Sequence, residues 1–236
     1  MLKEKIKLCF VGNPNVGKST LINRLLGANE LQISEHPGTT KNIIEKNLIW
    51  KEKKFTFLDT AGVYKKKDFN FNLLIKATRF SEIIILILDS SIDKLDRIHK
   101  KVASHSLKVG KGLIIIFNKW DLIENKKNKK KKIEELIKNC LPQFNERNLL
   151  FISALRDEKF RKIFKFSIEI KKLLKSVLRT SNLNKWLKDI IKHNPPIRIR
   201  GKEIKLKYIV QTNTSPPTFK IFSNYPNKIK SSYKRF

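Results

Sequence analysis

Acidic residues, cysteine and long apolar runs are all scarce in this sequence. Its 236 residues include 21 Asp and Glu and 2 Cys, at Cys9 and Cys140. Neither cysteine belongs to a CxxC pair or to a histidine spacing typical of zinc, which argues against a disulfide or a zinc site and predicts two reduced thiols. No segment approaches the ~18 apolar residues of a membrane helix, and residues 1–11 lack the apolar core of a signal peptide. These absences predict a cytoplasmic protein that does not enter a membrane.

Basic residues, in contrast, are abundant. The chain has 52 Lys and Arg and a formal net charge of +31, while 40% of its residues are hydrophobic. That hydrophobic content argues against intrinsic disorder and predicts a folded protein. Two explanations of the charge remain open: a polyanionic partner, with nucleic acid first, or the codon bias of an AT-rich genome. The 17 basic and 2 acidic residues from Lys171 onward contribute +15 of the +31, which favours a polyanion-binding surface in that part.

Short apolar runs alternate with segments of helical length along most of the chain. Five runs predict strands covered on both faces: Ile6–Val11, Phe55–Leu58, Ile83–Leu88, Leu113–Phe117 and Leu149–Ile152. Segments between them predict helices at Ser19–Leu26, Asp96–Lys108 and Lys130–Leu141. This order predicts an α/β fold with a doubly wound, mostly parallel sheet. A charged turn joins Ile43–Trp50 to Phe55–Leu58, which predicts a hairpin and hence one antiparallel edge strand.

The first domain, assigned to residues 1–175, ends with a long helix predicted from about Lys159 to Lys175. Within this domain the run Asn125–Lys132 carries six lysines and neither glycine nor proline, and it is predicted to open a helix whose apolar positions resume at Ile133. We interpret the run as a solvated loop and helix face, because a block of like charges is most often exposed to solvent.

Residues 176–236 are predicted to form a small α-β-β domain. Its helix follows an N-cap at Thr180 or Ser181 and ends before Pro195. The apolar positions of this helix are Leu183, Trp186, Leu187, Ile190 and Ile191. Period-two alternation predicts a strand that presents on one face Ile204, Leu206, Tyr208 and Val210. A second strand is expected near Phe219–Phe222.

A loop directly after the first predicted strand has the GxxxxGK[ST] spacing. It consists of Gly12, Asn13, Pro14, Asn15, Val16, Gly17, Lys18 and Ser19, with Thr20 next on the following helix. Glycines let consecutive backbone N–H groups surround phosphates, and the helix N-terminus adds positive potential. Lys18 is expected to reach the β- and γ-phosphates, and the Ser19 hydroxyl to bind Mg²⁺. The loop predicts a nucleoside triphosphate site without specifying the base.

A second motif follows the strand predicted at Phe55–Leu58. It consists of Asp59, Thr60, Ala61 and Gly62. Asp59 lies at the carboxyl end of a strand, where ligands bind in open α/β sheets, and is expected to hold Mg²⁺ through a water. The backbone N–H of Gly62 is expected to contact the γ-phosphate, so the segment that follows should respond to the presence of this phosphate.

The base is predicted from two further strand ends. After Leu113–Phe117 come Asn118, Lys119, Trp120 and Asp121. The Asp121 carboxylate can accept hydrogen bonds from N1–H and the 2-amino group of guanine, whereas adenine offers neither donor, so guanine is favoured. Lys119 is expected along the base plane and Asn118 against the phosphate loop. Ser153 and Ala154 are expected to supply a backbone N–H for guanine O6.

These motifs resemble those of the GTPases of the Era, Der and MnmE group, and the resemblance implies hydrolysis of GTP to GDP and phosphate. The segment His36–Thr40 is similar to the first switch of that group. The resemblance therefore implies that Thr39 or Thr40 joins the Mg²⁺ ligands and senses the γ-phosphate. The Arg-Asp pair that usually follows is replaced by Lys41 and Asn42.

Val63 occupies the position at which Ras-like enzymes carry a water-orienting glutamine. Related GTPases with a hydrophobic residue there use K⁺ as a positive charge between the phosphates, held partly by an asparagine of the phosphate loop. Asn15 matches that asparagine. The resemblance thus implies K⁺-stimulated hydrolysis.

The second domain resembles the KH-like domain that follows the second GTPase domain of the Der (EngA) family. The resemblance rests on His193–Pro196, Tyr208, Pro216–Phe219 and Ser232–Phe236. The family continues with a final helix and strand, so we expect a C-terminally shortened, incomplete domain. The GxxG loop with which KH modules clamp RNA is absent, because the domain contains one glycine, Gly201.

This resemblance implies a protein that binds the large ribosomal subunit and its rRNA in the GTP state and assists its maturation, and we expect a monomer. Two other functions remain open. One is a GTP-gated ribosome- or RNA-binding module with negligible hydrolysis. The other is an Era-like or MnmE-like role, which the missing GxxG loop and the absence of a terminal cysteine motif weaken.

Overall fold

The computed structural model describes residues 5–27, 34–37, 44–59, 75, 78–156, 158–196 and 203–229. Contacts divide the chain into two compact units, Met1–Leu173 and Leu174–Phe236. The sequence analysis placed a domain boundary two residues later, between 175 and 176. Within the described ranges, no helix is both long and apolar enough to cross a membrane.

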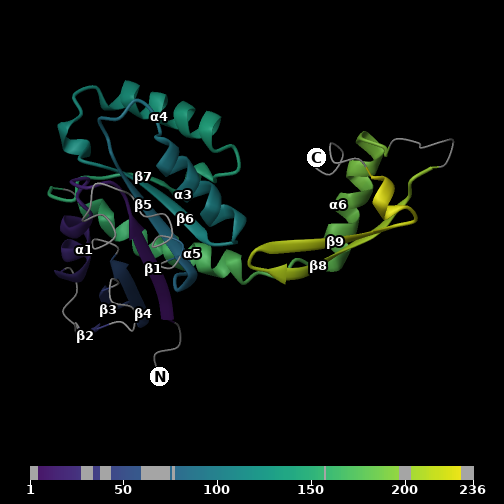
Figure 1. The fold of residues 1–236 in the computed structure, drawn as a ribbon, viewed down its shortest axis with the longest axis horizontal. Helices are drawn as coiled ribbons and strands as arrows, with labels where there is room; N and C mark the ends of the chain where they lie inside the picture. The colour runs from purple at the N-terminus through teal and green to yellow at the C-terminus, as the bar shows by residue number, and fades with distance from the viewer. Residues whose placement is uncertain are drawn as a thin grey trace. The chain divides into compact units, whose positions relative to one another are not determined.

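Seven strands form one sheet in the described part of the first unit (Figure 1). They are β1 (Lys5–Val11), β2 (Ser34–Pro37), β3 (Ile44–Trp50), β4 (Lys53–Asp59), β5 (Ile83–Asp89), β6 (Gly112–Asn118) and β7 (Leu149–Phe151). Their order is β2-β3-β4-β1-β5-β6-β7, and β3 alone among them runs against the others. This confirms the predicted α/β class. The antiparallel strand does not lie at the edge, however, because β2 pairs with its outer side.

The hairpin between β3 and β4 is confirmed and has a two-residue turn. Trp50 pairs with Lys53, and the two residues between them, Lys51 and Glu52, have φ angles of 48° and 61°. Positive φ at both central positions is the geometry of a type I′ turn, whose twist matches that of the flanking strands. The turn therefore forms without the Asn-Gly sequence that usually marks it.

Helices cover both faces of this sheet (Figure 1). They are α1 (Lys18–Gly27), α3 (Arg97–Lys108), α4 (Lys126–Cys140) and α5 (Lys162–Leu174). The apolar sides of α3 and α4 share one core with the sheet, and His99 of α3 is a buried packing residue whose pKa is lowered by burial. On the other face, Phe164 of α5 stacks on Trp50 at 5.0 Å and meets Phe55 edge-on at 4.9 Å. Coverage on both sides explains why the strand sequences are continuously apolar.

Helix α4 begins at Lys126, within the lysine run that was predicted to open it and four residues before the predicted helical segment Lys130–Leu141. The side chain of Asn125 caps it by accepting a hydrogen bond from the backbone N–H of Asn128 at 3.1 Å. The lysine run therefore forms the first two turns of the helix.

The described part of the second unit consists of α6 (Thr180–His193) packed on a hairpin of β8 (Leu206–Thr214) and β9 (Pro217–Ser223). Its core contains Leu183, Leu187 and Ile209. Two predictions were wrong. The N-cap residue is Arg179, not Thr180 or Ser181, and its side chain makes no capping bond. Tyr208 is exposed while its neighbour Ile209 is buried, because an irregularity between Leu206 and Tyr208 shifts the alternation by one residue.

Asn184 of α6 binds the outer edge of β8. Its side-chain Nδ2 donates to the carbonyl oxygen of Ile209 at 3.0 Å, and its Oδ1 accepts from the N–H of the same residue at 3.0 Å. The side-chain amide thus satisfies the two polar groups that Ile209 turns away from β9.

Candidate functional site

Three of the predicted motifs meet at the carboxyl edge of the sheet in the first unit. The loop after β1, the start of α1 and the segments after β6 and β7 surround a cavity of about 200 Å³. Its lining residues are Asn15, Gly17, Thr20, Asn118, Lys119, Asp121, Leu122, Ser153, Ala154 and Leu155. Parallel strands place their carboxyl ends along one edge, which is why segments more than 100 residues apart converge there.

Lys18, the first residue of α1, is held inside the loop after β1. Its Nζ donates to the carbonyl oxygens of Gly12 at 2.8 Å and Asn13 at 2.7 Å, and the residue is 7% exposed. These contacts hold the positive charge of the ammonium group inside the loop, where a phosphate would bind. Ser19 and Asn15, in contrast, are exposed.

The two glycines of this loop are required by close packing as well as by backbone conformation. A Cβ at position 12 would lie 2.3 Å from the carbonyl oxygen of Ile87 in β5. Gly17 has φ +90°, and a Cβ there would lie 2.2 Å from Nδ2 of Asn118. The glycines therefore let the loop approach β5 and the segment after β6.

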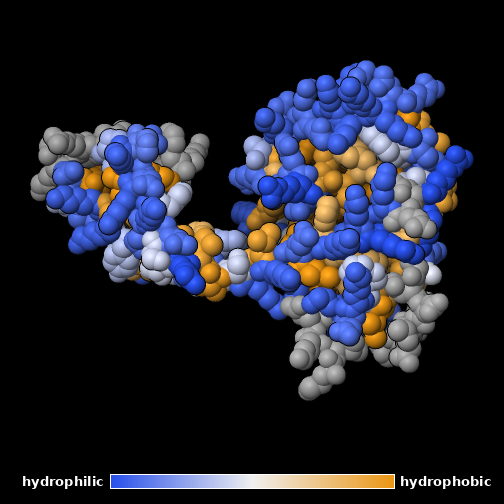
Figure 2. Space-filling view, turned by 180° about the vertical axis from the view of Figure 1, so that it is seen from behind, coloured by the Kyte–Doolittle hydropathy of each residue, from blue (hydrophilic) through white to orange (hydrophobic). Residues whose placement is uncertain are grey.

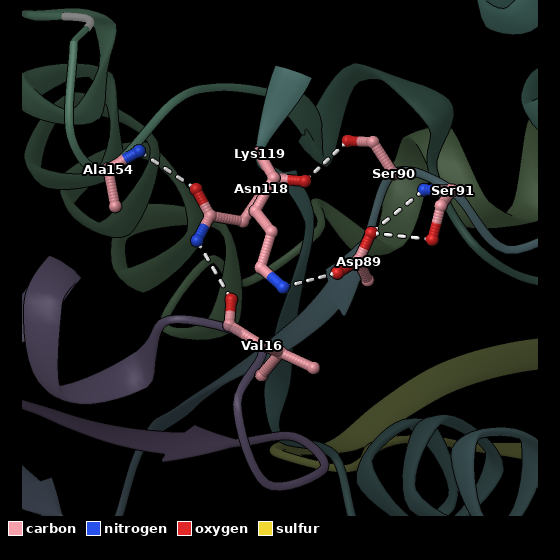
Figure 3. Close-up of polar contacts among 7 residues, drawn as sticks. All are labelled: Val16, Asp89, Ser90, Ser91, Asn118, Lys119 and Ala154. Atoms are coloured by element: carbon pink, nitrogen blue, oxygen red, sulfur yellow. Dashed lines mark hydrogen bonds and ion pairs between the residues drawn. The ribbon is translucent and has the colours of Figure 1, made fainter. Parts of the chain in front are cut away.

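Asn118, the last residue of β6, links two sides of the cavity (Figure 3). Its Nδ2 donates to the carbonyl oxygen of Val16 at 2.8 Å, and its Oδ1 accepts from the N–H of Ala154 at 2.8 Å. The contact with Val16 matches the predicted brace on the phosphate loop. The segment Ser153–Leu155 is expected to supply a backbone N–H for guanine O6, and of these groups the N–H of Ala154 is bonded to Asn118. Asn118 thus fixes the spacing between the loop after β1 and the loop after β7.

Lys119 has a left-handed backbone conformation, with φ 62°. Its Nζ forms an ion pair with Oδ2 of Asp89 at 2.7 Å (Figure 3). Oδ1 of Asp89 accepts from the N–H of Ser91 at 2.9 Å and from its hydroxyl at 2.7 Å. Burial tends to raise the pKa of Asp89, but these hydrogen bonds and Lys119 outweigh it and hold the pKa below its ordinary value. Sequence reasoning did not identify Asp89, although its position at the end of β5 is a usable signal.

Asp121 presents an ionised carboxylate at the cavity. A hydrogen bond from the side chain of Ser153 lowers its pKa, and the positive charges of Arg156 and Lys126 act in the same direction. Nε of Arg156 lies 3.8 Å from Oδ2 of Asp121. A carboxylate kept charged in this way is an acceptor for two adjacent N–H donors.

Trp120 is a packing residue that supports this segment. Its ring centroid lies 4.5 Å from that of Phe151 in β7, and its backbone N–H donates to the carbonyl oxygen of Ile152 at 3.0 Å. These contacts hold the turn that carries Asp121 against β7.

Several predicted site residues lie outside the described residues. They are Thr39, Thr40, Thr60, Ala61, Gly62 and Val63. The backbone of Asp59 ends β4, opposite Phe10 of β1, and the structure does not describe its side chain. The strand end predicted for Asp59 is therefore observed, while its role at a metal stays a prediction.

Arg24 of α1 is a further site residue that sequence reasoning missed. Its Nη1 donates to the carbonyl oxygen of Ala154 at 3.0 Å, and its guanidinium carbon lies 5.0 Å from the centre of the Phe160 ring. Ala154 is thus held by Asn118 through its N–H and by Arg24 through its carbonyl. No local sequence pattern indicates this contact, because 130 residues separate its two partners.

We expect Arg24→Ala to weaken the binding of a nucleotide in this cavity by about three- to tenfold, because loss of one hydrogen bond to the loop after β7 costs about 1 kcal/mol. GTP and GDP should be affected equally, since the contact lies away from the phosphates. Dissociation of a fluorescent guanine nucleotide, followed by stopped flow, measures the effect. Arg161→Ala is the control, because Arg161 lines the same groove beside Arg24 and Phe160. Equal effects of both changes would contradict the bracing role.

The fold and the site together define a P-loop GTPase domain: a mostly parallel sheet, a phosphate loop after β1, and an Asn-Lys-x-Asp segment after β6. A family model described as 50S ribosome-binding GTPase matches residues 7–119. A model described as the C-terminal KH-domain-like of EngA bacterial GTPase enzymes matches residues 178–236. The chain thus carries a GTPase domain followed by the KH-like domain of EngA enzymes, and it resembles the Der (EngA) GTPases across both.

Curated relatives support this resemblance. The chain is 36% identical over 241 residues to GTPase Der of Natranaerobius thermophilus, which covers 99% of this chain and 54% of that protein. It is 35% identical over 243 residues to GTPase Der of Fusobacterium nucleatum, with 99% and 55% covered. The chain therefore spans about half the length of the curated relatives it matches.

Solved structures support the fold. Era of Aquifex aeolicus bound to GDP and AlF4⁻ has a TM-score of 0.54 and 23% identity, over 94% of this chain and 78% of that one. Era in complex with MgGDPNP and nucleotides 1506–1542 of 16S ribosomal RNA has a TM-score of 0.54 and 24% identity, over 93% and 77%. At this identity the likeness concerns the fold alone.

Proposed function

We propose that this protein binds GTP with Mg²⁺, hydrolyses it to GDP and phosphate with the help of K⁺, and acts as a GTP-dependent factor in maturation of the large ribosomal subunit. The observation that carries the proposal is the cavity in which Asn118 joins the phosphate loop to the segment that presents the Asp121 carboxylate. The descriptions of the matching models, a 50S ribosome-binding GTPase and an EngA domain, support the ribosomal role.

The chain offers oxygen ligands suited to Mg²⁺ at this edge of the sheet. The exposed hydroxyl of Ser19 at the start of α1 would bind the ion directly, and Asp59 at the end of β4 through a water. Thr40 or Thr39 would complete the shell in the GTP state. A bound Mg²⁺ would neutralise phosphate charge. These residues are hard oxygen donors, as Mg²⁺ requires.

The chain's own groups account for phosphate binding and orientation. The backbone N–H groups from Asn15 to Ser19 and the N-terminus of α1 face the phosphates, and Lys18 supplies a positive charge. The N–H of Gly62 senses the γ-phosphate and relays its loss to the segment after it. These positive groups are preorganised by the fold. They therefore stabilise mainly the negative charge that develops on the phosphates in the transition state of phosphoryl transfer.

Hydrolysis is expected to be faster in KCl than in NaCl of equal concentration, because Val63 cannot orient water and a K⁺ ion near Asn15 would supply the missing positive charge. Asn15 is exposed and has φ 62°, a backbone conformation that asparagine adopts more readily than most residues. Asn15→Ala should lower the rate in KCl by at least about tenfold and abolish the difference between the salts. Phosphate release measures the rate, with Asn23→Ala, an exposed asparagine of α1, as control. Comparable turnover in the two salts would refute the role of K⁺.

The ribosomal role is tested by sedimentation with purified large subunits. The protein should sediment with them in the presence of a non-hydrolysable GTP analogue and much less with GDP. A KCl series separates specific binding from general charge attraction, which falls steeply with salt. An association that is the same with both nucleotides and vanishes with salt would contradict the proposal.

A second candidate function is a GTP-gated binding module with negligible hydrolysis. It is favoured by Val63, which stands in place of a water-orienting residue. Single-turnover hydrolysis in KCl distinguishes the two functions.

A further inference from the structure

The first two turns of α4 carry a cluster of exposed lysines. We call it the α4 cluster, and its members are Lys126, Lys127, Lys130, Lys131 and Lys132. Figure 2 shows the region over α4, at the top of the first unit, as hydrophilic surface. Among the described residues, the cluster's ion pairing is limited to Nζ of Lys130 and Oε1 of Glu134, 3.7 Å apart.

The fold makes little use of the charge of this cluster. Lys129, which lies between its members, is used: its Nζ donates to the carbonyl oxygens of Ser91 and Ile92 and to Asp93. Within the described ranges the exposed lysines make weaker contacts, such as Nζ of Lys130 at 5.9 Å from the centre of the Phe151 ring. A role in holding α4 to the sheet therefore explains Lys129 and leaves the cluster unexplained.

The arrangement of the cluster also opposes helix formation. Lys126 and Lys130, and likewise Lys127 and Lys131, are four residues apart on the helix, where like charges repel. The first turn contains no acidic residue, so positive charge is concentrated at the helix end that is already electropositive. A bound polyanion would relieve both effects, and codon bias alone would not select this end of the helix.

We propose that the α4 cluster binds the phosphodiester backbone of RNA. The proposal rests on the ribosomal role proposed above and assigns an RNA contact to the GTPase unit in addition to the basic second unit. Residues 125–132 contain no apolar side chain. Protein–protein interfaces are depleted in lysine and enriched in aromatic residues at their centre. Contacts with the phosphates of RNA, in contrast, can be made by flexible, positively charged side chains alone. An RNA backbone therefore fits this surface better than an acidic protein does.

The test compares two full-length variants with the same reduction in charge. In the first, Lys127, Lys130, Lys131 and Lys132 are each changed to Gln, which removes the charge and keeps an unbranched polar side chain of similar helix propensity. Lys126 is left in place because its charge acts on Asp121. In the matched control the same change is made at four exposed lysines of α3 and α5: Lys108, Lys162, Lys165 and Lys172.

Binding of a short labelled RNA duplex is measured by fluorescence anisotropy over about 50 to 200 mM KCl. We expect the cluster variant to bind at least about tenfold more weakly at low salt. Its negative slope of log K against log salt should become about four units less steep, one unit for each lysine that no longer neutralises a phosphate. The control should change little. Equal weakening in the two variants, or unchanged binding by the cluster variant, would overturn the proposal, as would a poly-glutamate peptide that binds the cluster more tightly than RNA does.

Two parallel measurements keep this result separate from the proposed function. GTP affinity should be the same in both variants and in the unaltered protein. At low salt the melting temperature of the cluster variant should be no lower than that of the unaltered protein, because repulsion between lysines four residues apart has been removed. Absence of nucleotide-dependent ribosome binding in the unaltered protein, with RNA binding by the cluster intact, would refute the ribosomal role alone. Absence of RNA binding in the unaltered protein would refute the proposal about the cluster.

Discussion

Asp121→Asn is expected to change the base preference of the nucleotide site from guanine to xanthine. Asparagine replaces one acceptor oxygen by an NH₂ donor, which then faces the 2-amino group of guanine. Xanthine carries a carbonyl oxygen at that position, so the amide can accept from its N1–H and donate to its O2. GTP affinity should fall on the order of 10³-fold or more, because sites built around specific hydrogen bonds reject unmatched ligands strongly. Competition between XTP and GTP for a fluorescent nucleotide measures the change.

Asp93→Asn is the matched control for this substitution. Asp93 is also a carboxylate with a lowered pKa, because Nζ of Lys129 lies 2.8 Å from it, but its side chain is 87% exposed and does not line the cavity. This variant should keep the preference for GTP. Retained GTP selectivity in Asp121→Asn would show that the carboxylate does not recognise the base.

Lys18→Ala is expected to remove measurable GTP binding. Each charge-assisted hydrogen bond to a phosphate contributes about 1.5 to 3 kcal/mol. If Nζ exchanges a loop carbonyl for a phosphate oxygen and forms two such bonds, their loss corresponds to about 10² to 10⁴-fold in affinity. Binding of GDP should fall less than that of GTP, because the γ-phosphate contact exists only with GTP. Isothermal titration calorimetry with both nucleotides measures the difference.

Lys18→Ala could also lower GTP affinity by disturbing the loop, since Nζ of Lys18 donates to the carbonyl oxygens of Gly12 and Asn13, so a control for damage to the fold is required. Lys129→Ala is a suitable control, because Lys129 likewise donates to two backbone carbonyls, at 3.1 and 2.9 Å, but outside the cavity. Thermal melting of both variants reports any damage to the fold. Unchanged GTP affinity in Lys18→Ala would refute the phosphate role.

Much of the first unit could be predicted from the sequence for a physical reason. Its strands are buried on both faces, so they appear as continuous apolar runs, and parallel topology places the residue after each run at one edge. Asn118, Asp121 and Lys18 could therefore be brought together before the structure was known. The roles of Thr39, Thr40, Gly62 and Val63 stay predictions, since these residues lie outside the described ranges.

Contacts between distant elements could not be predicted in the same way. The bond from Arg24 to Ala154 and the ion pair of Lys119 with Asp89 depend on how α1, β5 and the loops pack, which no local pattern encodes. The face assignment of Tyr208 failed because one irregularity in the pairing of β8 reverses the alternation beyond it. The lysines of α4 were interpreted as solvated, and their repulsive placement became evident only once the start of the helix was known.

The contact of Asn184 with Ile209 has a consequence for association between molecules. An open strand edge presents unpaired N–H and C=O groups, on which a strand of another chain can assemble. At Ile209 the amide of Asn184 takes the place such a strand would occupy, and it uses both polar groups of that residue. The small sheet is thereby shielded at this point against intermolecular strand pairing and aggregation.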